Sequence, residues 1–220
     1  MKILGDISFG LDTRTASWLK DALNVDTFVE TGTYKGQTSH RMARIFKNVF
    51  TVEGSEFYFN AAVQNLVNDE NVSITNSDSV SFLEGSKWNY KPAIFWLDAH
   101  WCGTETAGVE NECPVIAEIR ALKNIDLNKS AILIDDARLF LKPPPEPHKI
   151  EQWPTLREVL EQLPIDHKIF IHNDVIFSVP ISISNKFTEF LRDSGEVIQT
   201  NRIPPLLALL QKIFRIIGLK

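Results

Sequence analysis

The chain has 220 residues, enough for one domain with a sizeable buried core, and 44% of them are hydrophobic. A formal net charge of −5 argues against a nucleic-acid partner, because binding through phosphate contacts normally requires a basic face. Two cysteines, Cys102 and Cys113, are too few for a disulfide framework, and the N-terminus, "MKILGDISFG", has too short an apolar stretch for a secretory signal or a membrane span, so we expect a cytoplasmic protein.

Strand-like and helix-like segments alternate along most of the chain. Residues 11–24 have the periodicity of an amphipathic helix, and we expect residues 1–25 to form an N-terminal helical segment. Apolar runs typical of buried strands follow at residues 27–30, 49–53, 72–75, 93–98 and 131–136. Helical spacing separates them at residues 38–46, 56–67 and 114–124. The alternation predicts a doubly wound, mostly parallel α/β sheet covered on both faces.

The pattern changes after a further predicted helix at residues 153–163. The stretch "HKIFIHNDVIFSV" (167–179) holds two strand-like runs separated by "HND", which predicts a hairpin. We therefore expect seven strands, closed by an antiparallel β-hairpin, in an α/β domain at residues 26–180, followed by a C-terminal helical extension at 181–220.

The tail "PPLLALLQKIFRIIGLK" (204–220) is rich in Leu, Ile and Phe. Its apolar residues return every three or four positions, which predicts a helix with one apolar side. We expect this helix to pack on its own domain or in a homodimer, and a weak membrane-surface contact is the alternative.

The stretch "FVETGTYKGQTS" (28–39) places an acid, Glu30, at the end of the first strand, followed by Gly32 and Gly36. Ligands of open α/β sheets bind beyond the carboxyl ends of the strands, and glycines there let the backbone approach a ligand closely. A glycine turn with a purely structural role is the alternative.

Acidic residues also follow the fourth and fifth predicted strands. Asp98 comes after one, and Asp135 and Asp136 come after the next, so the three carboxylates should converge at one edge of the sheet. Carboxylates that close repel one another unless a cation binds them, and oxygen ligands suit Mg²⁺. The alternative is zinc bound by Asp98, His100, Cys102 and Cys113, although the chain lacks a close Cys-x-x-Cys pair.

A mostly parallel sheet that ends in a hairpin resembles the Rossmann-like fold of the class I S-adenosylmethionine-dependent methyltransferases. Residues 30–36 are similar to the acid-x-Gly-x-x-x-Gly form of their motif I, which wraps the amino-acid end of S-adenosylmethionine. An acid before the loop would repel pyrophosphate but suits the ammonium and sulfonium charges of this cofactor. The resemblance implies a cofactor site made of Glu30, Gly32, Thr33, Gly36, Glu53, Ser77, Asp78 and Asp98.

Within that site, Glu53 would accept hydrogen bonds from both ribose hydroxyls, because a carboxylate offers two oxygens. Ser77 and Asp78 lie where the family contacts the adenine edge. For Asp78, a helix N-cap is the alternative, since "SDSV" precedes a helical run.

The strand-end acids resemble those of the metal-dependent O-methyltransferases of the catechol and macrocin types. That resemblance covers about residues 26–180 and implies Asp98, Asp135 and Asp136 as metal ligands. The lysine that some of these enzymes use as a base is absent from "DAHWCG". Asp98 and His100 are therefore the catalytic candidates, with His100 as general base and a structural hydrogen bond as its alternative role.

Two loops, residues 100–113 and 138–153, should lie over the site and select the acceptor, with Arg138, His148 and Trp153 as candidate contacts or ordinary loop residues. We expect a Mg²⁺-assisted O-methyltransferase acting on a small hydroxylated acceptor such as a sugar or glycan precursor. The alternatives are a metal-dependent hydrolase or transferase that uses Asp98, Asp135 and Asp136 without S-adenosylmethionine, and a non-catalytic binding module on the same fold.

Overall fold

The computed structural model describes residues 10–85, 91–103 and 105–194. The predicted helix at residues 204–220 lies outside this part of the chain, as does most of the expected extension at 181–220. No helix among the described residues is long and apolar enough to cross a bilayer.

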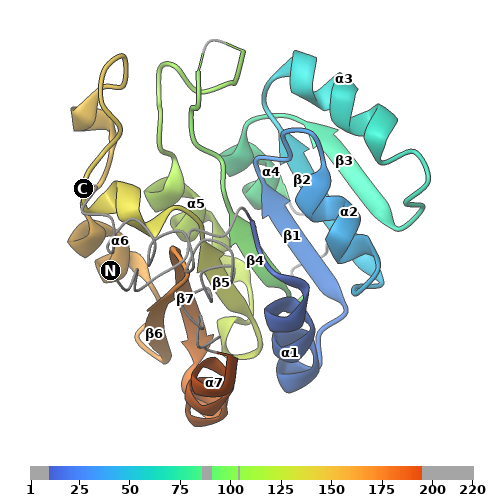
Figure 1. Cartoon of the computed structure of the whole chain (residues 1–220), viewed down its shortest axis with the longest axis vertical. Coiled ribbons are helices and arrows are strands. Elements are labelled where there is room, and N and C mark those ends of the chain that lie inside the picture. The colour runs from blue at the N-terminus through green and yellow to red at the C-terminus, as the bar shows by residue number, and fades with distance from the viewer. Residues whose placement is uncertain (1–9, 86–90, 104, 195–220) are drawn as a thin grey trace, which may run out of the picture.

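The described residues form one seven-stranded sheet in the order β3-β2-β1-β4-β5-β7-β6 (Figure 1). The strands are β1 (Thr27–Thr31), β2 (Asn48–Glu53), β3 (Val72–Asn76), β4 (Ile94–Leu97), β5 (Ala131–Ile134), β6 (His167–His172) and β7 (Val175–Pro180). Strands β1 to β5 pair in parallel, whereas β7 is antiparallel to both β5 and β6. The predicted sheet and its closing hairpin are confirmed.

Helices cover both faces of the sheet (Figure 1). They are α1 (Thr13–Leu23), α2 (Gln37–Ala43), α3 (Glu56–Asn65), α4 (Ser79–Gly85), α5 (Val115–Ala121), α6 (Leu156–Gln162) and α7 (Ile181–Ser194). Side-chain oxygens at the ends of loops start several of them: Asp12 accepts from the amide of Thr15 at α1, and Thr155 forms a capping box with Glu158 at α6.

Alternate residues of the central strands enter two hydrophobic cores, as the period of two of a strand requires. Phe28, Ile94 and Trp96 pack with residues of α1, α2 and α7 on one face. Val29 and Phe95 pack with residues of α4, α5 and α6 on the other. Since both faces are buried, these strands carry the continuous apolar runs from which they were predicted.

The turn between β6 and β7 consists of Asn173 and Asp174, which have φ values of 47° and 65°. Two consecutive residues with positive φ are typical of a tight type I′ hairpin turn. Because β7 runs against β5, this turn lies beside the carboxyl end of β5, where the amide of Ala137 donates to the carbonyl of Asp174 at 2.7 Å.

Candidate active site

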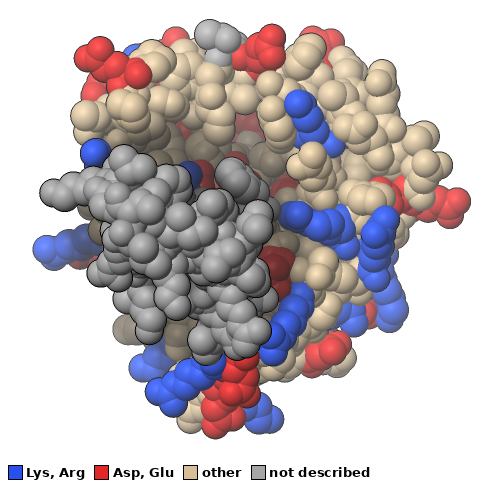
Figure 2. Space-filling view, viewed as in Figure 1, with Lys and Arg blue, Asp and Glu red and all other residues tan. Residues whose placement is uncertain are grey.

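A cavity of about 750 Å³ lies at the carboxyl ends of the central strands. Strand order reverses between β1 and β4, and this switch point is where open α/β sheets bind ligands. The volume is typical of small-molecule sites. Figure 2 shows the hollow, with acidic side chains inside it and basic side chains beside it.

The loop after β1 is held tightly against its neighbours. The amides of Gly32 and Thr33 both donate to the carbonyl of Val52 in β2, at 3.0 and 3.1 Å. Gly32 has a φ of +80°, and a Cβ there would lie 2.5 Å from the backbone oxygen of Asp98. A Cβ at Gly36 would come within 2.9 Å of the Leu66 side chain. Both glycines therefore leave space for other parts of the protein. The sequence predicted these glycines from the close approach of a ligand and did not predict this packing.

We expect Gly32→Ala to destabilise the protein by about 2–4 kcal/mol, because the new Cβ requires both a strained positive φ and a shift of the Asp98 backbone. Thermal unfolding should show a Tm lower by roughly 5–15 °C. Gly85→Ala is the matched control, since a Cβ at Gly85 meets nothing within 4 Å. Equal melting temperatures for the two variants would contradict this account.

Glu30 lies in β1, lines the cavity and is only 1% exposed. Its Oε2 accepts hydrogen bonds from Ser39 Oγ at 2.5 Å and from Thr51 Oγ1 at 2.8 Å. Burial raises the pKa of Glu30 to about 7, while the bonds from Ser39 and Thr51 and the positive charge of Arg41 act in the opposite direction. A cationic ligand group beside Glu30 would favour its ionised form.

Glu53, at the end of β2, also lines the cavity and is buried. Its Oε2 accepts from the amide of Tyr34 at 2.7 Å and its Oε1 from the amide of Ser55 at 2.8 Å. Burial raises the pKa of this carboxyl group despite these bonds. Glu53 thus fixes the loop after β1 and the start of α3, in addition to facing the cavity.

Of the other predicted cofactor residues, Gly36 does not line the cavity, whereas the rest do, namely Gly32, Thr33, Ser77, Asp78 and Asp98. Thr33 Oγ1 shares a hydrogen bond of 2.6 Å with Thr51 Oγ1. Asp78 Oδ1 accepts from the amide of Ser81 at 2.8 Å, so Asp78 caps α4, which is the alternative role predicted for it. That hydrogen bond lowers the pKa of Asp78.

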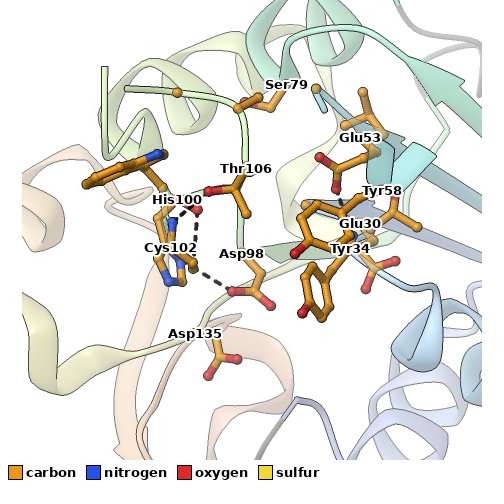
Figure 3. A pocket seen from close by; sticks show the side chains of 18 of the residues that line it. Glu30, Tyr34, Glu53, Tyr58, Ser79, Asp98, His100, Cys102, Thr106 and Asp135 are labelled. Atoms are coloured by element: carbon orange, nitrogen blue, oxygen red, sulfur yellow. Dashed lines mark hydrogen bonds and ion pairs between the residues drawn. The ribbon is translucent and has the colours of Figure 1, made fainter. Parts of the chain in front are cut away.

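Sequence reasoning missed an aromatic pair on the same wall. The rings of Tyr34 and Tyr58 are 4.3 Å apart between centroids, and both side chains line the cavity (Figure 3). Next to Gly54 and at the start of α3, the loop after β4 makes two contacts: Ser55 Oγ donates to the carbonyl of Glu105 at 2.7 Å, and a Cβ at Gly54 would lie 2.7 Å from that of Ala107. The loop after β4 therefore reaches across to the start of α3.

The acids after β4 and β5 do converge, together with His100 (Figure 3). Nδ1 of His100 is 3.5 Å from Oδ1 of Asp98, and its Nε2 is 3.1 Å from Oδ2 of Asp136. Among the described residues, Asp98, His100 and Asp136 form the one group of three or more possible metal ligands whose ligand atoms lie within 4.8 Å of one another. Asp135 is not a member of this group, and its Oδ1 accepts from the amide of Asp136 at 2.8 Å. This group shares Asp98 and Asp136 with the predicted metal set, which stays a prediction.

Neither cysteine of the alternative zinc set belongs to this group of described residues. Cys113 is buried, and Cys102 is exposed with its Sγ directed to the carbonyl of His100 at 3.5 Å.

The acid cluster gathers the carboxyl groups of Asp98, Asp135 and Asp136 near one imidazole. Burial raises the pKa of Asp98 well above its usual range and that of Asp135 to about 6, and nearby carboxylates add to both shifts. Burial alone would lower the pKa of His100, but the hydrogen bond to Asp136 and the charge of Asp98 raise it well above its usual range. Burial would raise the pKa of Asp136, but His100 and Arg138 hold it below its ordinary value. Such a cluster favours a bound positive charge.

Glu112 joins the two loops expected to lie over the site, and it was not singled out from the sequence. The side chain is 1% exposed; its Oε1 accepts from the amide of Lys149 at 3.0 Å. Its Oε2 accepts from Trp153 Nε1 at 2.9 Å and lies 3.1 Å from His148 Nδ1. Burial would raise the pKa of Glu112, but the bonds from Trp153, Lys149 and His148 hold it below its ordinary value.

Of the three expected acceptor contacts, only Arg138 lines the cavity within the described part of the chain. Its guanidinium is paired with Asp136, at 2.6 Å, and with Asp174. Trp153 is buried and packs edge-on against His100, with ring centroids 5.6 Å apart. It therefore contacts a residue that lines the cavity without lining the cavity itself. His148 packs in the same way against Trp101.

No profile of a known protein family matches the sequence, and no curated protein matches it either. Its structure, however, matches solved O-methyltransferases. TomG from Streptomyces achromogenes, involved in tomaymycin synthesis and solved with S-adenosylmethionine (SAM), aligns with a TM-score of 0.55 at 13% identity, over 78% of this chain and 81% of TomG. The chain has the fold of the class I O-methyltransferases. The resemblance in fold expected from the sequence is thereby confirmed.

Two further methyltransferase structures agree. A provisionally assigned caffeoyl-CoA O-methyltransferase from Staphylococcus aureus aligns with a TM-score of 0.57 at 16% identity, over 80% of this chain and 86% of that one. An O-methyltransferase from Bacillus cereus, solved with S-adenosylhomocysteine (SAH), gives 0.51 at 14% identity, over 77% and 82%. At these identities the likeness is one of fold, and the roles of individual site residues remain predictions.

Proposed function

We propose that this protein is a SAM-dependent methyltransferase that methylates an oxygen of a small hydroxylated acceptor, such as a sugar or glycan precursor. The observation that carries the proposal is the cavity at the switch point, with Glu30 and Glu53 on one wall and the Asp98, His100 and Asp136 cluster on the other. The fold supports it, since the structures from Streptomyces achromogenes and Bacillus cereus contain SAM and SAH.

On the cofactor wall, each residue type suits a different part of SAM. Glu30 offers a carboxylate to the ammonium group, and Glu53 can accept from the ribose hydroxyls with the lone pairs left free by its two backbone bonds. Tyr34 and Tyr58 present aromatic surface to the nucleoside. SAM supplies the electrophilic methyl group, so these residues need only hold it in line with the acceptor.

On the opposite wall, the two carboxylates and the imidazole are a donor set that fits a divalent cation. A nitrogen ligand widens the choice from Mg²⁺ to ions such as Mn²⁺ or Zn²⁺. When bound, such an ion supplies positive charge that favours ionisation of an acceptor hydroxyl. Asp98, Asp136 and the neutral form of His100 would hold it, and Arg138 would orient Asp136. The alternative role of His100, as general base toward the acceptor hydroxyl, would apply to catalysis without the ion.

Calorimetric titration tests the proposal without knowledge of the acceptor. We expect the protein to bind one SAH per chain, and to bind Mn²⁺ or Mg²⁺ at the acid cluster. Asp136→Asn should weaken the ion at least tenfold, because it removes one charged ligand, and should change SAH affinity less than about threefold. Glu110→Gln, at an exposed position of the same loop region, is the control for a general change of charge.

Failure of the wild-type protein to bind SAH would overturn the proposed function. Ion binding without SAH binding would instead favour the metal-dependent hydrolase or transferase. If the wild type bound SAH and Asp136→Asn changed neither the SAH affinity nor the ion affinity, the ion at the acid cluster would be removed from the mechanism.

A further inference from the structure

Arg41, in α2, is a cation of the cavity wall to which no role was assigned from the sequence. Its Nη2 donates to Thr38 Oγ1 at 3.3 Å. Its Nε is buried, and no residue in the described part of the chain accepts a hydrogen bond from it. A buried donor without a partner is unfavourable and rare in folded proteins, so an arginine in a ligand cavity that has one points to an anionic ligand group.

The chain before α1 confines this guanidinium. Gly10, which also lines the cavity, has a φ of +78°, and a Cβ there would lie 2.7 Å from Arg41 Nη2 and 2.9 Å from Thr38 Oγ1. The backbone at Gly10 therefore passes directly against the guanidinium. Arg41 is fixed in place, as a group that recognises a ligand by geometry must be.

The carboxylate of Glu30 lies near enough for the charge of Arg41 to lower its pKa, yet the hydrogen bonds to Glu30 come from Ser39 and Thr51. The two opposite charges therefore act on each other through space and face the same cavity. A phosphate group would gain from Arg41 but would be repelled by Glu30. The zwitterionic end of an amino acid satisfies both, because it carries one ammonium and one carboxylate on neighbouring atoms.

The other cations that line the described cavity have different contacts. Lys35 places its Nζ over the ring of Tyr34, 5.1 Å from the centroid. Arg138 is paired with Asp136 and Asp174 at the acid cluster. Arg41 is thus the cation best placed for a carboxylate beside Glu30.

We propose that Arg41 binds the carboxylate of the amino-acid end of the cofactor, so that Arg41 and Glu30 together select a ligand carrying an amino-acid zwitterion. The inference rests on the proposed function, since it assigns a residue to one end of SAM. It makes Arg41 a specificity-determining residue, which separates SAM and SAH from nucleosides that lack the amino acid.

The test compares two ligands that differ at this end. SAH carries the amino acid, whereas 5′-methylthioadenosine keeps the adenosine and the thioether but lacks it. Arg41→Met retains the length and apolar stem of the side chain and removes the guanidinium. We expect it to weaken SAH binding about 10- to 100-fold in calorimetry, as loss of a charge-assisted hydrogen-bonded pair does, with the affinity for 5′-methylthioadenosine unchanged within about twofold.

Arg44→Met is the matched control, because Arg44 ends the same helix, is exposed and contacts His40 at 2.9 Å. Both of its affinities should equal those of the wild type. Arg41→Lys keeps the charge but loses the planar guanidinium. Its affinity for SAH should lie between those of the wild type and Arg41→Met, and its affinity for 5′-methylthioadenosine should be unchanged. This variant tests the proposal if Arg41→Met folds poorly.

Unchanged SAH affinity, or an equal loss for both ligands, would overturn the role of Arg41. A wild-type protein that binds neither ligand would instead count against the proposed function.

Discussion

Replacing Glu112 with alanine is expected to lower the free energy of unfolding by about 3–5 kcal/mol, because it removes a buried charged acceptor and leaves its donors unpaired. The orphaned groups are the indole of Trp153, the amide of Lys149 and the imidazole of His148. Urea denaturation should show the loss as a lower midpoint, and thermal melting as a Tm reduced by roughly 6–20 °C.

Glu110→Ala serves as the control, since Glu110 lies two residues away and is exposed. Glu112→Gln should be intermediate, because the amide keeps one acceptor oxygen but turns an NH₂ group towards a donor. Equal urea midpoints for Glu112→Ala and Glu110→Ala would show that the two loops are held together by other contacts.

The second large effect concerns Glu30 and reverses the usual direction of a site mutation. Glu30→Gln should stabilise the ligand-free protein by about 3 kcal/mol at pH 8, because the pKa of the buried carboxyl is about 7 and its ordinary value is 4.5. Between these two values the folded state keeps a proton that the unfolded state has lost, so the contribution of Glu30 to stability falls as the pH rises from 4.5 through 7. Glutamine carries no such penalty and retains an acceptor for Ser39 and Thr51.

Urea midpoints of the variant and the wild type should therefore coincide near pH 4.5 and separate by pH 8. Glu84→Gln, an exposed acid on α4, controls for other titrating groups. A gap of equal size at both pH values would contradict the explanation by burial. The same variant should bind SAH less tightly, since the amide cannot offer a charge to the ammonium, so stability and ligand binding change in opposite directions.

The fold could be predicted because buried parallel strands leave unbroken apolar runs, and because a two-residue turn between β6 and β7 leaves no room for a crossover helix. The convergence of Asp98 and Asp136 followed from the same topology. The sequence did not predict which of the two consecutive acids, Asp135 or Asp136, approaches His100. That depends on the left-handed conformation of Asp136, with φ of 56°, and on the hydrogen bond from its amide to Asp135.

Other site residues depend on partners far along the chain. Position 32 must be glycine because the backbone of Asp98 lies against it, and Glu112 accepts a hydrogen bond from Trp153. A local sequence pattern does not reveal either contact. Arg41 lies in a short helix whose spacing predicts only which residues face the core. The role proposed for it rests on the folded chain, which brings Gly10, Thr38 and Glu30 together with it around one cavity.

The reversed direction of β7 gives the cavity wall that carries the acid cluster a source of variation that strand-to-helix loops do not have. The turn at Asn173 and Asp174 sits beside the acids after β5, and Asp174 already holds Arg138. A hairpin turn can be lengthened or exchanged while its two strands keep their register, because it carries no helix whose packing must be preserved. Under the proposed function, acceptor preference could therefore diverge, or be redesigned, through insertions at this turn while the wall at Glu30 and Glu53 and the hydrophobic cores stay as they are.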